Sequence, residues 1–211
     1  MYIPAAFRED RLEVLHAHIR EHSFGTLISL VDGELCATHL PFLLDETRGQ
    51  NGTLLGHMAR ANPHWRGFQS GLESLVIFHG PHAYISPGWY ATEQSVPTWN
   101  YTAVHAYGTP ALLDDAPRVR ELLERTVRTF EGDRQDAWST ARVAESYIAN
   151  MARGIVAFEL PIARLEGKRK LGQNRSAADV QGAAEGLRAR GDPVGLAVAE
   201  LMTEALDGAA S

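Results

Sequence analysis

The first half of the chain alternates apolar and polar residues over short runs, whereas its start, residues 117–152 and its end repeat apolar residues at helical spacing. In REDRLEVLHAHIREH (8–22), Leu12, Leu15 and Ile19 fall on one face, which predicts an amphipathic opening helix. Next, FGTLISLV and ELCATHLPFLLD flank Asp32-Gly33. An Asp-Gly pair between β-rich runs indicates a hairpin, because both turn residues tolerate positive φ.

Further strands are predicted downstream of this hairpin. They are TLLGHMARA, LESLVIFHG, HAYISPGWY and PTWNYTAVHAYGTPALL. Between the third and fourth of these lies a polar loop, and we expect a hairpin turn at Gly80-Pro81, bracketed by His79 and His82. About six short strands separated by turn signals predict a closed antiparallel barrel or a sandwich.

The pattern then becomes helical. Residues 117–131 and 141–152 carry helical periodicity and predict a helical insertion at 117–152. GIVAFELPIARLEG predicts one more strand, in which Pro161 marks a bulge or an edge position. Two helices close the chain and form a predicted hairpin over 176–207. We therefore expect one domain over residues 1–211, with helices at both ends and one helical insertion, and no second independent domain.

Composition narrows the class of protein. Hydrophobic residues make up 45% and charged residues 22% of the chain, as in a globular protein with a core. The net charge of -6 argues against a surface that coats nucleic acid, although it leaves room for a local basic patch. Cys36 is the single cysteine, which fits a reducing compartment. The chain shows no long apolar run and no leader pattern, so we expect a cytoplasmic protein without a membrane segment.

Two stretches have the side chains to bind a planar anion. GHMARANPHW (56–65) places a cation, an amide and imidazoles after an apolar strand. ISPGWYATEQSVPTWNY (85–101) is rich in aromatic residues, and strand alternation puts Thr98 and Asn100 on one face and Trp99 and Tyr101 on the other. Core or dimer packing is the alternative role for these aromatics. Together the stretches offer stacking faces, amide donors and a cation, which suits a planar anionic cofactor.

The basic arm GKRKLGQNRS (167–176) is the dense positive cluster of the chain. It is either a solvated connector between a strand and a helix or a phosphate site, since Gln173 and Asn174 add neutral donors to its cations. Contact with nucleic acid is weakly supported, because no aromatic residues interleave the charges.

The sequence lacks the motifs for metal binding, for nucleophilic catalysis and for nucleotide binding. The nine histidines show no HExxH or comparable spacing for a metal. No GxSxG elbow, GxGxxG turn or P-loop is present, and Cys36 inside a strand is interpreted as a small buried hydrophobe. The residues alone thus predict a barrel with a site for an anionic, aromatic-stacking ligand, and they do not name the ligand.

Several motifs in fixed order do resemble a known family. MYIPAAF, THLPF, GHMARANPHW, IFHGPHAYISPGWY, VPTWNY and KLGQNRS, spread from Met1 to about Arg190, resemble the PaiB-type family of FMN-binding negative transcriptional regulators. One departure is Gly172, where that family more usually has Ser before Gln-Asn. The resemblance implies a mainly β, flavin-reductase-like FMN-binding split β-barrel, antiparallel and Greek-key-like, with an N-terminal helix, a helical insertion and C-terminal helices. It also implies a homodimer with FMN at the subunit interface.

The resemblance also implies which residues bind FMN. At the strand end of GHMARAN, Arg60 with His57 and Asn62 would hold the phosphate. The neighbouring strand would line the flavin ring, a second subunit would approach the isoalloxazine with its VPTWNY motif, and the basic arm would complete the pocket. These further candidates are Thr38, His39, Leu40 and Pro41 on the strand, Thr98, Trp99 and Asn100 in the motif, and Lys170, Gln173 and Asn174 in the arm.

Three functions stay open from the sequence. The resemblance favours an FMN-binding regulator, although direct DNA binding is weakly supported, because the second closing helix lacks the Arg, Asn or Gln side chains that bind base edges. A flavin-dependent oxidoreductase of the flavin reductase or pyridoxamine-phosphate-oxidase type is the first alternative, with His39 and Tyr90 as residues to test. A haem-binding variant of the same barrel is the second. Whether the protein is an enzyme is left undecided.

Overall fold

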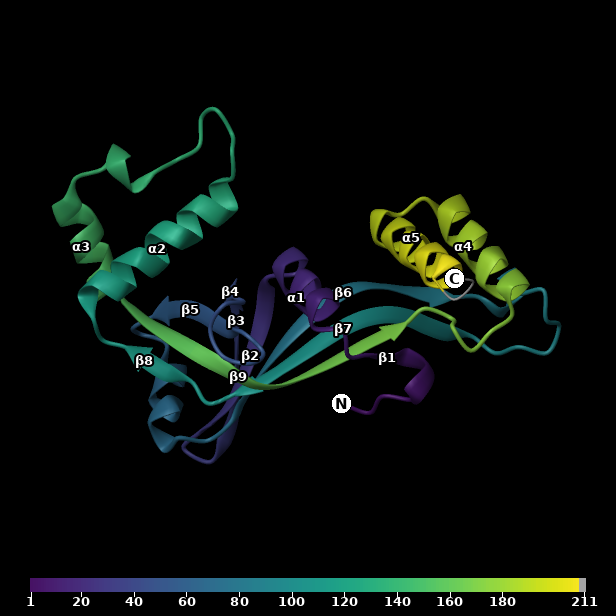
Figure 1. Ribbon diagram of the computed structural model, residues 1–211, viewed down its shortest axis with the longest axis horizontal. Coiled ribbons are helices and arrows are strands. Elements are labelled where there is room, and N and C mark those ends of the chain that lie inside the picture. Colours follow the sequence, from purple (N-terminus) through teal and green to yellow (C-terminus); the bar gives the residue numbers. More distant parts are fainter. Residues whose placement is uncertain (209–211) are drawn as a thin grey trace. The chain divides into compact units, whose positions relative to one another are not determined.

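Antiparallel strands flanked by helices make up the chain, as predicted (Figure 1). The computed structural model describes residues 1–208. The strands of this part are β1 (Arg8–Glu9), β2 (Phe24–Val31), β3 (Glu34–Pro41), β4 (Leu43–Asp45), β5 (Thr53–Ala59), β6 (Ser74–Ile85), β7 (Thr98–Gly108), β8 (Ala111–Leu113) and β9 (Ile155–Lys170). Its α-helices are α1 (Leu12–Glu21), α2 (Ala116–Glu131), α3 (Glu145–Arg153), α4 (Ala177–Arg190) and α5 (Pro193–Asp207), and its 3-10 helices are η1 (Ala5–Phe7), η2 (Pro63–Ser70), η3 (Pro87–Trp89) and η4 (Thr140–Arg142).

The strands follow the order β3-β2-β6-β7-β9-β5-β4, and β1 and β8 also pair with β9. The predicted hairpin at Asp32-Gly33 is confirmed, because β2 and β3 pair from Val31↔Glu34 to Phe24↔Pro41. Asp32 (φ 54°) and Gly33 (φ 85°) are both left-handed, as a two-residue turn requires. The fold class predicted from the sequence, mainly antiparallel β with helices at both ends and in an insertion, is therefore confirmed.

The predicted hairpin turn at Gly80-Pro81 is wrong, because both residues lie inside the continuous strand β6. Buried positions alternate from Ser74 to Gly80 and then resume at Ala83, one residue out of phase. Such a phase shift is what a bulge produces. The strand therefore accommodates the turn-like pair as an irregularity, and the rings of His79 and His82 meet at 5.0 Å instead of lying across a turn.

The basic arm and Pro161 also differ from expectation. Strand β9 runs on to Lys170, so the first four residues of the arm are strand, and Gly167 and Lys168 pair with β1. Pro161 marks neither an edge nor a bulge towards β5, because β9 has β5 and β7 as neighbours and its register with β5 is unbroken from Pro161 to Ile155. The opening helix starts later than predicted, at Leu12, because Arg8 and Glu9 form β1 and two residues connect this strand to the helix.

The chain forms two compact units, and each is described by itself. Unit 1 contains Met1–His18, Phe78–His105 and Glu166–Ser211, of which residues up to 208 are described; unit 2 contains Ile19–Ile77 and Ala106–Leu165. Strands β6, β7 and β9 contribute residues to both units. The single domain predicted over residues 1–211 stays a prediction.

In unit 1, α4 and α5 form the predicted C-terminal hairpin and lie side by side (Figure 1). Gly191 ends α4 in the left-handed conformation, Asp192 caps α5 by accepting from Gly195 N at 2.8 Å, and Pro193 occupies the first helical position. The hairpin buries its apolar residues against β6 and the residue after β9. This core contains Ala83, Ile85, Leu171, Val180, Ala183, Ala184, Leu187, Val198, Ala199 and Met202.

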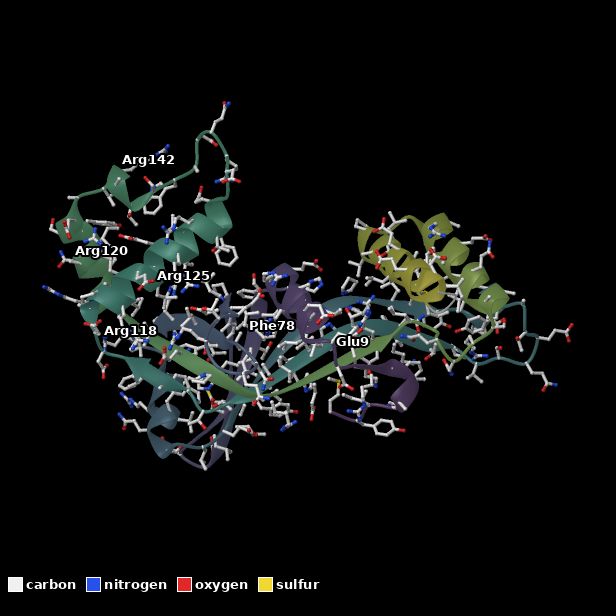
Figure 2. The ribbon with its side chains drawn as sticks, in the orientation of Figure 1. Glu9, Phe78, Arg118, Arg120, Arg125 and Arg142 are labelled. Carbon is white, nitrogen blue, oxygen red and sulfur yellow. The ribbon has the colours of Figure 1, made fainter. Side chains whose placement is uncertain are left out.

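In unit 2, the insertion helix α2 is fixed to the sheet by arginines that Figure 2 labels along it. Arg118 pairs with Glu159 of β9 at 2.7 Å, and Arg125 pairs with Asp45 of β4 at 3.3 Å. Leu122 of the same helix is buried among apolar residues of β4, β5, β8 and β9. Burial and ion pairs together position the insertion. No helix in residues 1–208 has the length and apolar character to cross a membrane.

Candidate functional site

The polar end of β5 is organised by Asn62. Its side-chain oxygen accepts a hydrogen bond from His64 N at 3.0 Å and caps η2, in which Pro63 is the first residue. An asparagine followed by proline is a favourable start for such a turn. The Asn side chain accepts a hydrogen bond from a free backbone N–H of the first turn, and Pro has no N–H that would need an acceptor. The ANPHW sequence therefore ends the strand and turns the chain at once, which explains why an apolar strand closes on polar residues.

Arg60, the predicted phosphate ligand, lies exposed just beyond β5. Its Nε donates to Arg153 O at 2.8 Å and its Nη2 donates to Ile155 O at 2.7 Å. The remaining terminal nitrogen, Nη1, makes no hydrogen bond within residues 1–208. The guanidinium is thus held rigidly at the start of β9 and still has donors to offer an anion.

Thr38 is brought together with the end of β5. Its hydroxyl oxygen lies 2.7 Å from Nδ1 of His64 and accepts from Asn62 Nδ2 at 3.2 Å. His64 is fully buried, and burial lowers the pKa of its imidazole. The structure therefore joins two of the predicted residues, Thr38 and Asn62, through a histidine that the sequence analysis did not select.

The other predicted residues of β3 are arranged differently. His39 points to the opposite face from Thr38, where its Nδ1 lies 2.9 Å from Thr26 Oγ1 and its ring stacks on Phe24 at 6.5 Å. Leu40 is buried, and Pro41 is partly exposed. The strand therefore offers one polar side chain, Thr38, to the end of β5.

His57 lies within β5, opposite Ala157 of β9, and is partly buried. Burial lowers the pKa of this imidazole, so it is neutral at pH 7. A neutral imidazole offers one donor and one acceptor but no charge to a phosphate. Among the candidates at this strand end, the cationic role is left to Arg60.

Unit 2 also contains an apolar cavity of about 790 Å³ that the sequence analysis did not foresee. Arg60 and Trp65 border it, whereas Thr38 and Asn62 do not. Its walls come from β8, α2, α3 and the start of β9, and include Leu112, Val119, Leu123, Ile148, Ala149 and Ala152. Two of the lining residues from α3, Ala149 and Ala152, have small side chains.

In unit 1, the basic arm meets the VPTWNY motif. Lys170 Nζ donates to the main-chain oxygen of Trp99 at 2.6 Å and to the hydroxyl of Thr98. Partial burial, followed by the charges of Lys168 and Arg175, lowers the pKa of Lys170. Two neutral acceptors hold this cation, and no carboxylate of residues 1–208 forms an ion pair with it, so an anion would be a favourable further partner.

Trp99 is the centre of an exposed aromatic patch on unit 1, which consists of His79, His82, Tyr84 and Trp99. The indole is 53% exposed and lies 6.1 Å from His82 and 6.2 Å from Tyr84 between ring centroids. Large aromatic side chains exposed together are typical of surfaces that bind a ligand or another protein.

Three predicted residues of unit 1 are not part of this surface. Asn100 is 2% exposed and donates to the sulfur of Met202 at 3.3 Å, on the face covered by α5. Gln173 closes its own turn, accepting from Leu171 N at 2.8 Å and donating to Arg169 O at 2.6 Å. Asn174 is exposed and makes no hydrogen bond within the described residues.

The cations of the arm have separate roles. Lys168 is 8% exposed, donates to Tyr2 O at 3.2 Å and lies 5.1 Å from the ring centroid of Tyr101. Arg175 stacks over Tyr90 at 4.5 Å, and burial raises the pKa of that phenol. The arm is therefore not one positive patch, and Lys170 is its cation closest to the exposed aromatics.

Cys36 is partly exposed, so its interpretation as a buried hydrophobe is wrong. It lies on β3, at the end of the strand order, where one side of the strand has no neighbour in the sheet as described. Within residues 1–208, no three His, Cys, Asp or Glu side chains gather in a way that could hold a metal ion.

Comparison with known proteins extends these observations. Residues 1–164 match the model of a family described as "Putative FMN-binding domain". Protease synthase and sporulation protein PAI 2 from Bacillus subtilis is 35% identical over 206 residues, which cover 98% of each chain. An uncharacterised protein from Aspergillus fumigatus is 30% identical over 253 aligned positions, with 97% of each chain covered.

Two solved structures share the fold. The FAD and heme binding protein from Mycobacterium smegmatis has a TM-score of 0.61 at 18% identity and covers 88% of this chain and 80% of its own. The flavocytochrome Anf3 from Azotobacter vinelandii has a TM-score of 0.61 at 15% identity and covers 77% of this chain and 69% of its own. At these identities the likeness extends to the fold alone.

Proposed function

Because this chain belongs to the family described as "Putative FMN-binding domain" and is a relative of PAI 2, we propose that it binds FMN as a homodimer and acts as a negative transcriptional regulator of the PaiB type. Family membership supports a flavin ligand in general. That the flavin is FMN, that two copies of the chain form a dimer and that the protein represses transcription are further steps that we propose.

The observation that carries the proposal is the position of Lys170 beside an exposed indole. Its ammonium group is held by Thr98 and by the main-chain oxygen of Trp99, and the Trp99 ring is half exposed. A cation fixed next to an aromatic face suits a ligand that combines a planar ring with a phosphate, which describes FMN. Arg60, with Nη1 unused, is the second candidate for the phosphate.

The exposed aromatic patch supports a homodimer. Trp99 and Tyr84 expose 53% and 38% of their surface, and aromatic residues are enriched in protein interfaces. In the proposed dimer, the Trp99 surface of one copy and the Arg60 strand end of the other enclose FMN together. Binding of FMN and dimerisation are then coupled.

The regulatory role rests on family resemblance and on the name of the Bacillus subtilis relative, "Protease synthase and sporulation protein PAI 2". The C-terminal hairpin offers little support for direct reading of DNA, since Val198, Ala199 and Met202 of α5 are buried in the unit 1 core. The chain also carries a net charge of -6. We therefore propose that repression acts through a partner instead of through base contacts by α5.

An absorption spectrum of the purified protein, followed by titration with FMN and sedimentation with and without FMN, tests the proposal. Flavin bands and a dimer stabilised by FMN support it, whereas protein that binds no added FMN contradicts it. A Soret band supports the haem alternative instead. Anaerobic reduction of the bound flavin by NADH or NADPH would favour an oxidoreductase over a regulator.

DNA binding needs its own experiment, because the phosphate backbone alone can attract a protein at low salt. Mobility shift is measured at low and at moderate salt with DNA from upstream of the gene. The proposal of indirect repression predicts no shift under either condition. A shift that persists at moderate salt would contradict it and support direct binding.

A further inference from the structure

His64 is an unusual side chain in unit 2, because it is polar, fully buried and only half satisfied. Its exposed fraction is 0%, and its Nδ1 lies 2.7 Å from the hydroxyl oxygen of Thr38. Its other ring nitrogen, Nε2, is buried and has no hydrogen-bond partner within residues 1–208. A buried polar atom without a partner destabilises the fold, so its retention points to a function of this side chain.

The direction of the hydrogen bonds at Thr38 follows from Asn62. The side-chain oxygen of Asn62 accepts from His64 N at 3.0 Å, which orients the amide. Its NH₂ group must then face Thr38, where Nδ2 lies 3.2 Å from the hydroxyl oxygen. The Thr38 oxygen therefore accepts one hydrogen bond from Asn62.

Two arrangements are possible for the second bond, between Thr38 and His64. Burial lowers the pKa of His64, so the ring is neutral at pH 7 and carries one proton. If Nε2 carried it, an N–H donor would be buried without an acceptor. If Nδ1 carries it, the atom without a partner is an acceptor. Buried donors without partners are the rarer case in proteins, which favours the proton on Nδ1.

With the proton on Nδ1, the Thr38 oxygen accepts from both Asn62 and His64. Its two lone pairs are then used, and its own proton is directed away from the network. Thr38 is partly exposed, which leaves room for a further partner to accept that proton. A threonine hydroxyl normally rotates between donor and acceptor roles, whereas this one is held as a donor.

We propose that His64 is a positioning residue that, with Asn62, holds the Thr38 hydroxyl as a hydrogen-bond donor to an acceptor atom of the flavin ring, an inference that rests on the proposed binding of FMN. The edge of the isoalloxazine carries carbonyl oxygens and ring nitrogens that accept hydrogen bonds. A fixed donor is preorganised for such an atom and selects against ligands that present an N–H group at the same place.

A double-mutant cycle tests this, with FMN affinity measured by quenching of flavin fluorescence. Thr38→Val removes the hydroxyl at nearly constant volume and lowers the affinity about fivefold, the scale of one neutral hydrogen bond. His64→Phe keeps a buried ring but removes the donor, and it lowers the affinity about fivefold in the wild-type background. In the Thr38→Val background it changes the affinity less than about twofold, because no hydroxyl is left to orient.

Three results of these titrations would contradict the inference or the proposed function. If His64→Phe lowers FMN affinity by the same factor in both backgrounds, His64 acts through the general structure and the inference is overturned. Wild-type protein that binds no FMN overturns the proposed function and this inference together. Wild-type binding with additive substitutions overturns this inference alone.

Two further variants keep the test decisive if His64→Phe does not fold. His64→Asn places an amide donor near the position of Nδ1, so it retains affinity within about twofold of wild type even if urea unfolding shows lower stability.

Asn62→Asp keeps the acceptor for His64 N but reverses the bond to Thr38, because a carboxylate accepts the hydroxyl proton. It should weaken binding of riboflavin, which has no phosphate for the new charge to repel, as much as Thr38→Val does. Unchanged riboflavin affinity in Asn62→Asp would contradict the inference.

Discussion

The ammonium nitrogen of Lys170 lies 2.6 Å from the main-chain oxygen of Trp99 and donates a hydrogen bond to it. The two residues come from different sequence motifs, because Lys170 belongs to the basic arm at the end of β9 and Trp99 to the VPTWNY segment at the start of β7. Their contact fixes a cation beside an exposed indole. The proposed function makes this pair the centre of the unit 1 contribution to FMN binding.

Lys170→Met is expected to weaken FMN binding by about 1.5–3 kcal/mol, the scale of a hydrogen bond to a charged group. Arg169→Met is the matched control, because Arg169 is the neighbouring cation and lies 4.0 Å from Glu204, away from Trp99. Titration of both variants with FMN and riboflavin checks the prediction. Equal losses for the two ligands would mean that Lys170 does not contact the phosphate.

Arg60→Ala is expected to weaken FMN binding by a similar amount, about 1.5–3 kcal/mol, and also to lower stability, because Arg60 donates to two main-chain oxygens at the start of β9. Arg66→Ala is the control, since Arg66 is exposed and its guanidinium lies over the ring of Trp65 at 5.8 Å. Calorimetric titration separates binding from stability. An unchanged dissociation constant in Arg60→Ala would place the phosphate elsewhere.

Trp99→Ala is expected to weaken dimerisation and FMN binding together, because a site shared by two copies couples the two equilibria. Replacing an indole by a methyl group removes a large part of the surface that one side chain can bury at an interface, so the effect on dimerisation should be large. Trp138→Ala, at an indole of unit 2 that is 37% exposed, is the control. Sedimentation that finds an intact dimer with normal flavin content in Trp99→Ala contradicts the prediction.

Local chemistry made parts of this fold predictable. The Asp32-Gly33 turn needs only two residues with positive φ between alternating runs, and the structure has that turn. Gly80-Pro81 carries an equally local signal that failed, because β6 continues through the pair as one strand that keeps its neighbours and accommodates the pair as a bulge. A local turn signal therefore produces a turn only where the two flanking strands can also pair with each other, as β2 and β3 do.

The candidate site shows the same division. Alternation predicted that Asn100 and Trp99 face opposite ways, but it could not tell that α5 would cover the Asn100 face. The cap that Asn62 forms on η2 is local, whereas the bond between His64 and Thr38 spans 26 residues and depends on tertiary packing. Sequence patterns thus located the motifs, and only the fold shows which member of each motif reaches a surface.

Gly186 of α4 is a further feature that no periodicity would reveal. A Cβ atom at this position would lie 2.3 Å from Cδ2 of Trp89, so the indole packs directly on the helix backbone. Gly186→Ala should destabilise the protein by about 1–3 kcal/mol through overpacking, although alanine is the better helix former. Urea unfolding checks this, with Glu185→Ala, at an exposed position of the same helix, as the control. Greater stability in Gly186→Ala would contradict the packing.

Two histidines in unit 2 make stability depend on pH. Burial lowers the pKa values of both His57 and His64 in the folded protein. The unfolded chain therefore binds more protons than the folded one as the pH falls below about 6.5, and the free energy of unfolding must fall with it. Urea midpoints of the FMN-free protein should decrease from about pH 7.5 to about pH 5.5. His64→Phe removes one of the two groups, so its midpoint should decrease less over the same range. A wild-type midpoint that stays constant over this range would show that neither imidazole resists protonation, and His64 would then have no reason to remain a neutral donor to Thr38.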